Sequence, residues 1–170
     1  VPSPKRAAAC SPERTAPSTH GWTSQSPANT SGGRWGSERM RAIAGVSAGA
    51  FGAVDMALRH VGLFQTAESW EGYFQPFRDG PFEHASGAAL AAHNPTLLAR
   101  KESASIRRHG LRFFLSTGGS HGAVKRDWTF EFERELRGLR IGSRLWAQPP
   151  GVPNFGRNQL PAALQYAEPG

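Results

Sequence analysis

The sequence predicts an α/β fold, in which helices flank a mostly parallel β-sheet. From Met40 onward, apolar runs of strand length alternate with segments whose apolar residues recur every three or four positions. Such alternation is typical of parallel sheets, because a helix joins each strand to the next. The 170 residues are enough for one domain with a hydrophobic core.

The first predicted unit is a strand that turns directly into a helix. AIAGVS, residues 42–47, is a short apolar run suited to a buried parallel strand. The helix after it carries apolar residues on one face: Phe51, Val54, Leu58 and Val61. LFQTAESW, residues 63–70, is predicted as the second strand, and a loop rich in aromatic residues, Gly and Pro follows it.

The remaining elements are defined by their end signals. Asn94 and Pro95 predict the N-cap and first turn of a helix that runs to His109 and stops at Gly110. LRFFLST, 111–117, is the clearest strand. Asp127 is predicted as the N-cap of the next helix. The buried face of this helix is predicted to carry Trp128, Phe132, Leu136 and Leu139. SRLWAQ (143–148) is predicted as the last strand, and QLPAALQYA (159–167) as the closing helix.

Residues 1–37 differ from the rest in composition. They contain no Leu, Ile, Met, Phe or Tyr, and more than half of them are Ser, Thr, Pro or Gly. Such a segment buries too little apolar area to offset the entropy lost on ordering. We therefore predict a disordered or low-complexity leader over 1–37 and a folded domain over 38–170.

The composition argues against several classes of function. The single cysteine, Cys10, cannot form an internal disulfide, and no spacing of His, Cys or carboxylates predicts a metal or a cofactor. No apolar run is long enough to span a membrane, and no signal peptide is evident, so the sequence indicates no compartment. The net charge of +7 comes from scattered arginines, which fits a solvated surface better than a nucleic-acid site.

The stretch GVSAG, residues 45–49, matches the G-x-S-x-G pattern at a predicted strand-to-helix corner. There the glycines allow strand and helix to approach, the hydroxyl of Ser47 stands above the sheet, and the N–H of Ala48 is offered to an oxyanion. The alternative is that Ser47 only caps the helix. A second match, GGSHG at 118–122, is less favoured, because the helix after Ser120 is predicted to begin several residues later.

Residues 41–74, RAIAGVSAGAFGAVDMALRHVGLFQTAESWEGYF, resemble the nucleophile-elbow region of the putative esterase family of α/β-hydrolases. This family includes esterase D, feruloyl esterases and the antigen 85 mycolyltransferases. The similarity continues to about residue 168. It implies a Ser, acid, His triad in that chain order, used for acyl transfer from carboxylic esters, with Ser47 as nucleophile and Ala48 as an oxyanion-hole donor.

The chain departs from this family at three places. The family histidine follows the last strand, where this chain reads PPGVPNFG (149–156), and the family acid follows the strand 111–117, where it reads GGSHG. The family also has strands ahead of the nucleophile that residues 1–37 do not encode. The chain thus resembles the C-terminal half of a hydrolase, with the strand 42–47 left as a sheet edge prone to self-association.

A replacement base is His121, oriented by Asp127 or Glu68, if it comes within hydrogen-bond reach of Ser47. Two functions stay open on these grounds. One is a serine carboxylic-ester hydrolase or acyltransferase acting on a small-molecule ester through an acyl-enzyme at Ser47. The other is a catalytically inactive remnant that binds a partner through the exposed sheet edge.

Overall fold

The structure is a computed structural model that describes residues 41–118, 122–149, 152–153 and 155–168. They belong to one compact unit, Trp35–Gly170. Its centre is a sheet of four parallel strands in the order β1-β2-β3-β4. The strands are β1 (Ala42–Val46), β2 (Thr66–Trp70), β3 (Arg112–Thr117) and β4 (Ser143–Ala147). The predicted parallel α/β class is confirmed.

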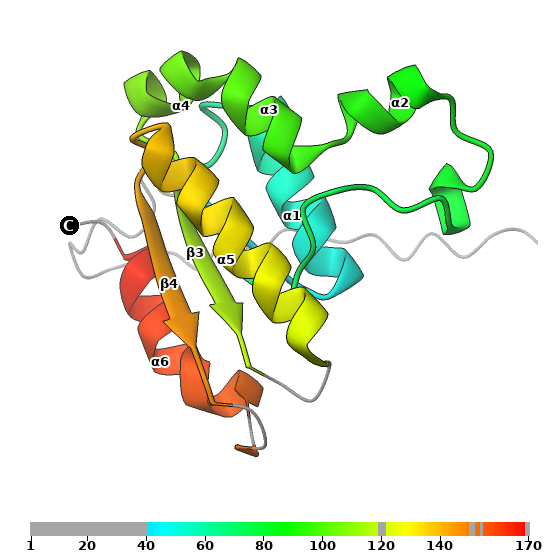
Figure 1. Cartoon of the computed structure of the whole chain (residues 1–170). Coiled ribbons are helices and arrows are strands. Elements are labelled where there is room, and N and C mark those ends of the chain that lie inside the picture. Colours follow the sequence, from blue (N-terminus) through cyan, green and yellow to red (C-terminus); the bar gives the residue numbers. More distant parts are fainter. Residues whose placement is uncertain (1–40, 119–121, 150–151, 154, 169–170) are drawn as a thin grey trace, which may run out of the picture. The chain divides into compact units, whose positions relative to one another are not determined.

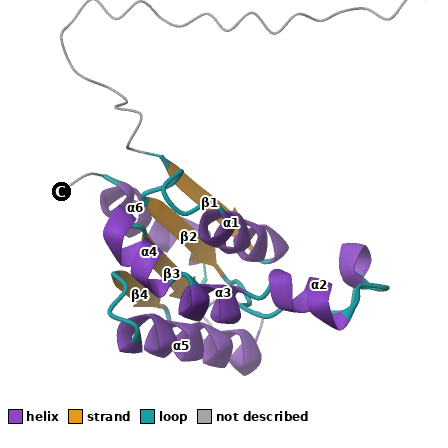
Figure 2. Ribbon diagram, turned by 90° about the horizontal axis from the view of Figure 1, so that it is seen from above, coloured by secondary structure: helices purple, strands orange, loops and turns teal. Residues whose placement is uncertain are grey.

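Helices cover both faces of this sheet (Figures 1 and 2). One face carries α1 (Ala48–Arg59), α3 (Pro95–Lys101) and α5 (Gly122–Gly138), and α6 (Phe155–Ala167) lies on the other. The connections contain η1 (Gly80–Phe82), α2 (Gly87–Ala92) and α4 (Ser103–His109). Within the described ranges, no helix has both the length and the apolar character needed to cross a bilayer.

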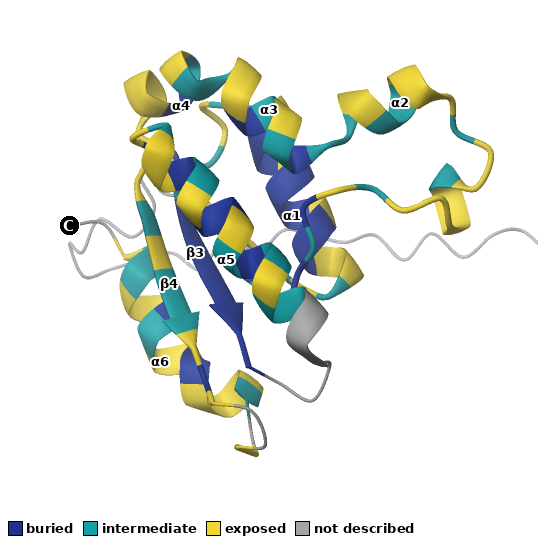
Figure 3. Ribbon diagram, in the orientation of Figure 1, coloured by how far each residue is buried: buried dark blue, intermediate teal, exposed yellow. Residues whose placement is uncertain are grey.

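The hydrophobic core lies between the sheet and the layer of α1, α3 and α5. Figure 3 shows β3 and the inner side of α1 as buried. Phe113 of β3 meets Phe132 of α5 edge-on, with ring centroids 6.1 Å apart, and Phe132 stacks on Phe74 at 4.1 Å. Phe113 and Phe132 are at most 2% exposed. Burying aromatic rings contributes several kcal/mol each, so this cluster fixes α5 on the sheet.

The predicted caps of the 94–109 segment are confirmed, but its continuity is wrong. The Asn94 side chain accepts a hydrogen bond from the Leu97 N–H at 3.1 Å, and Gly110 ends the segment with φ 73°. Between them, Glu102 leaves the helical conformation at φ −94°, ψ 9°, and separates α3 from α4. The kink lets Ile106 of α4 enter the core.

Two other boundaries differ from prediction. Strand β2 begins at Thr66, because residues 61–64 form a turn closed by a bridge between Val61 and Phe64. Helix α5 begins at Gly122, so Asp127 lies inside the helix, and its predicted role as N-cap is wrong. Ala, Lys and Arg in the intervening residues favour helix, which explains the early start. The early start also removes the argument against GGSHG, although Ser120 lies outside the described residues.

Strand β1 forms one edge of the described sheet, as the sequence predicted. It pairs with β2 on one side, and no described strand pairs with its other side. Its exposed residues include Val46, with 58% of its surface accessible, and the neighbouring helix exposes Met56 at 45%. The apolar strand β1 therefore lies at the edge of the described sheet, although its sequence is typical of a buried central strand.

Candidate active site

The carboxyl ends of the strands converge on one edge of the sheet, with Ser47 directly after β1. Strand register places Val46 beside Trp70, and Trp70 beside Ser116. The ladder continues one residue further, because the Ser47 N–H donates to the Trp70 carbonyl at 2.9 Å. In open parallel sheets this edge is where ligands bind.

Ser47 alone joins β1 to α1, and its backbone is strained. Its φ of 54° and ψ of −116° lie in a region that L-residues rarely adopt. Its carbonyl accepts from the N–H groups of Ala50 and Phe51 at 3.0 and 3.2 Å, but its side chain makes no capping hydrogen bond. The alternative in which the hydroxyl caps α1 is therefore wrong.

The tight corner depends on the first glycine of the pattern. A Cβ added to Gly45 would collide with the Gly49 carbonyl and lie 2.7 Å from the Ala50 nitrogen. At Gly49, by contrast, no described atom lies within 4 Å of an added Cβ. Close packing of strand and helix thus requires glycine at position 45, and nothing described requires it at position 49.

Lys125 contacts the hydroxyl of Ser47. Its Nζ lies 3.1 Å from Ser47 Oγ, and the lysine is partly buried. Lys125 belongs to the first turn of α5, which packs against β3 and β4. The sequence did not point to this residue, because the helix was predicted to begin at Asp127. The available signal was the Lys125–Arg126 pair shortly after the strand 112–117.

Among the other predicted site residues, Ala48 occupies the expected place. It is the first residue of α1, where the backbone N–H has no carbonyl partner within the helix. Asp127 is exposed and lies two positions from Lys125, so it faces a different direction on α5 and is not brought to Ser47. His121 lies outside the described residues, and its role as base stays a prediction.

Two glutamates, Glu68 within β2 and Glu71 directly after it, differ in their distance from the carboxyl end of the sheet. Glu68 lies two residues before Trp70, the last residue of β2, about 7 Å back from the carboxyl end of the strand. It accepts from Trp70 Nε1 at 3.0 Å, and burial raises its pKa, partly offset by that hydrogen bond. The proposed role of Glu68 as an orienting acid at the edge is therefore not supported. Glu71, which the sequence analysis did not select, lies at the edge with φ 55° and accepts from the Gly118 N–H at 2.6 Å.

A cavity of about 230 Å³ lies between the loop after β2, α3 and α5, and its polar lining residues are Gln75, Thr96, Arg100, Glu131 and Glu135. Trp128, one helical turn beyond Lys125, lines it together with the loop residues Tyr73, Phe74 and Phe77. These aromatic residues are divided between the cavity wall and the core. Phe74 is buried against Phe132, whereas Phe77 is 39% exposed and packs against Trp128 with ring centroids 5.3 Å apart.

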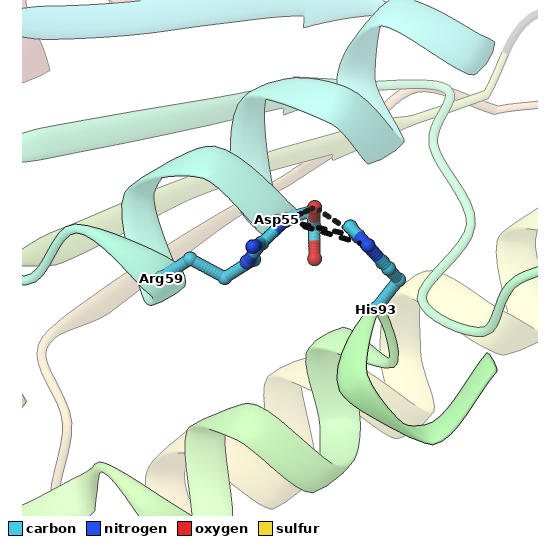
Figure 4. Close-up of polar contacts among 3 residues, drawn as sticks. All are labelled: Asp55, Arg59 and His93. Carbon is cyan, nitrogen blue, oxygen red and sulfur yellow. Dashed lines mark hydrogen bonds and ion pairs between the residues drawn. The ribbon is translucent and has the colours of Figure 1, made fainter. Parts of the chain in front are cut away.

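An acid and histidine pair, Asp55 of α1 and His93 at the end of α2, lies away from Ser47 (Figure 4). Asp55 Oδ2 lies 2.9 Å from His93 Nδ1 and 3.9 Å from an Arg59 nitrogen. Asp55 is eight residues beyond Ser47 along α1, a rise of about 12 Å, so this pair does not reach the hydroxyl. It ties α1 to the end of α2. The described residues contain no group of three or more His, Cys, Asp or Glu side chains placed to hold a metal.

Comparison with known proteins gives a consistent assignment of fold. The model of a family described as "Putative esterase" matches residues 24–139. A ferulic acid esterase superposes with a TM-score of 0.57 at 18% identity, covering 76% of this chain and 51% of that protein. S-formylglutathione hydrolase (FrmB) from Staphylococcus aureus gives 0.53 at 18% identity, with 77% and 53% covered.

The fluorophosphonate-binding serine hydrolase FphF of Staphylococcus aureus gives a TM-score of 0.54 at 17% identity, with 77% of this chain and 56% of that protein covered. No curated protein matches the chain. The chain therefore spans about half the length of these solved structures. At these identities the likeness establishes the fold, which is that of the α/β-hydrolases, as the sequence predicted.

Proposed function

Because this chain belongs to the putative esterase family, we propose that it cleaves carboxylic esters through an acyl-enzyme at Ser47. The acyl group then passes to water or to another acceptor. The observation that carries the proposal is the backbone of Ser47, held at φ 54° at the end of β1 with its hydroxyl free of any helix cap. Strained turns of this kind expose a nucleophile above the sheet.

The neighbouring groups suit the steps of acyl transfer. Ser47 Oγ attacks the ester carbonyl, and the N–H of Ala48 stabilises the negative charge that develops on the carbonyl oxygen. We place the acyl or aryl part of the substrate against the aromatic wall of the cavity, which is formed by Tyr73, Phe77 and Trp128, because aromatic side chains bind such groups. The similar solved structures include a ferulic acid esterase and an S-formylglutathione hydrolase, which supports an ester or thioester substrate.

The proposal predicts a burst of coloured alcohol when the protein is mixed with a chromogenic ester, because acylation releases the alcohol before the acyl-enzyme is hydrolysed. Ser47→Ala is expected to lose both the burst and the later turnover. Ser143→Ala, at the opposite end of the sheet, is the matched control and keeps both. Equal bursts from wild type and Ser47→Ala would rule out Ser47 as the nucleophile.

A second candidate function is favoured by the unpaired edge of the described sheet. In it, the chain is catalytically inactive and binds a second copy of itself through β1. Two identical edge strands can pair antiparallel about a two-fold axis, which would cover Val46 and Met56.

Under this second candidate, sedimentation velocity is expected to show a dimer whose fraction rises with protein concentration. Val46→Lys should shift it to monomer, because a charged side chain on an edge strand opposes pairing. Leu164→Lys, on the far helix α6 and 59% exposed, is the matched control. A monomer at every concentration would contradict this candidate.

A further inference from the structure

We propose that Lys125 is the base that activates Ser47. This inference rests on the proposed function and supplies the residue that its mechanism lacks. Within the described residues, Lys125 is the basic side chain in hydrogen-bond contact with the nucleophile, and its Nζ donates to Ser47 Oγ at 3.1 Å. That separation lies within the range at which a base can take the proton from a serine hydroxyl.

Both partners are held by rigid elements. Ser47 is fixed by its N–H bond to the Trp70 carbonyl and by the start of α1. On α5, the Thr129 hydroxyl donates to the Lys125 carbonyl at 2.8 Å, and Phe132 anchors the next turns in the core. The two side chains therefore meet in a geometry set by packing, which is the condition for efficient proton transfer.

A lysine base also accounts for two departures from the family pattern together. A catalytic histidine needs an acid to hold one tautomer and orientation, as in the Ser-His-Asp arrangement. A lysine amine has a single nitrogen and no tautomers, so it needs no such acid. The chain lacks both the histidine and the acid at their matching positions, in 149–156 and 118–122.

The other described candidates do not reach the hydroxyl. The His93 and Asp55 pair lies two turns further along α1, and Glu68 lies back from the sheet edge. Arg126, next to Lys125, turns toward the ring of Phe130, with its guanidinium carbon 5.5 Å from the ring centroid. An arginine is in any case a poorer base than a lysine, because its guanidinium is effectively never deprotonated in proteins.

The proton transfers balance over the full cycle. After the Lys125 ammonium has released a proton to solvent, its amine accepts the Ser47 proton as Oγ forms its bond to the ester carbon. The resulting ammonium returns this proton to the alcohol oxygen as the ester C–O bond breaks. Water then attacks the acyl-enzyme and gives its proton to the amine, which passes it to Ser47 Oγ as the acid leaves.

The test measures the rate constant of covalent modification by a small fluorophosphonate. Lys125→Met and Lys125→Arg are expected to react at least about 100-fold more slowly than wild type, the usual contribution of a general base. Arginine keeps the charge and the hydrogen-bond donor, so its failure would separate base catalysis from electrostatic positioning. Lys125→His is expected to recover part of the lost rate. Lys101→Met, an exposed lysine on α3, is the matched control and reacts like wild type.

Each alternative outcome has a defined meaning. Lys125→Arg reacting as fast as wild type would overturn the inference, because the cation alone would then suffice. If all Lys125 variants react normally and Ser47→Ala does not react, the proposed function stands and this inference fails. If wild type reacts no faster than Ser47→Ala, both fail. Equal thermal unfolding midpoints for Lys125→Arg and wild type would establish that the slower reaction does not come from loss of folding. The partly recovered reaction rate of Lys125→His is an independent readout of base catalysis.

Discussion

Gly45→Ala is expected to destabilise the fold by about 3 kcal/mol, at the upper end of the usual cost of overpacking. The new methyl group would meet the Gly49 carbonyl and the Ala50 nitrogen, and both are backbone atoms. No change of side-chain rotamer relieves such a contact, so β1 and α1 must move apart. The buried face of α1, which contributes Val54 and Leu58 to the core, would then lose its packing.

Urea unfolding followed by circular dichroism measures this loss of stability, and Gly49→Ala is the matched control. Its added Cβ meets no described atom within 4 Å, and alanine is a better helix former than glycine. We expect Gly49→Ala to be more stable than wild type by about 0.5 to 1 kcal/mol. If Gly45→Ala unfolded at the same urea concentration as wild type, the close approach of strand and helix would be contradicted.

Ser47→Gly is expected to abolish ester turnover and to stabilise the fold by about 1 kcal/mol. The activity is lost with the nucleophilic oxygen. The stability rises because glycine adopts positive φ without steric cost, whereas a non-glycine residue in such a region costs on the order of 1 to 3 kcal/mol. A strained active-site residue that lowers stability is a known trade-off.

Ser47→Ala separates the two effects, since alanine removes the oxygen but keeps the Cβ that causes the strain. It should be inactive and close to wild type in stability. Thermal unfolding of the three proteins compares the free energies directly. Equal stability of the glycine and alanine variants would mean that the backbone of Ser47 is not strained.

Local signals predicted most of the fold. The apolar runs gave β1, β3 and β4, and Asn94 and Gly110 marked the ends of a helical segment. The errors arose where tertiary packing decides the outcome. Glu102 lies in a segment with good helix formers, yet a kink there lets Ile106 reach the core. Asp127 has the chemistry of an N-cap, but the preceding residues are equally able to form helix.

The site was predictable in part. The glycine pattern around Ser47 records a local backbone requirement, so it was visible in the sequence. Lys125 was not, because its contact with Ser47 joins residues 78 positions apart and depends on where α5 begins. Glu71 was missed for a related reason. Its carboxylate is placed by a left-handed backbone conformation after β2, which no residue preference indicates for glutamate.

The nucleophilic role of Ser47 is tested most directly by peptide mass spectrometry after reaction with a fluorophosphonate. Trypsin cleavage after Arg41 and Arg59 releases residues 42–59, a peptide in which Ser47 is the sole serine. We predict that the phosphonate adduct lies on this peptide. An adduct found instead on residues 113–125, which contain Ser120, or on no serine of the protein, would contradict the account.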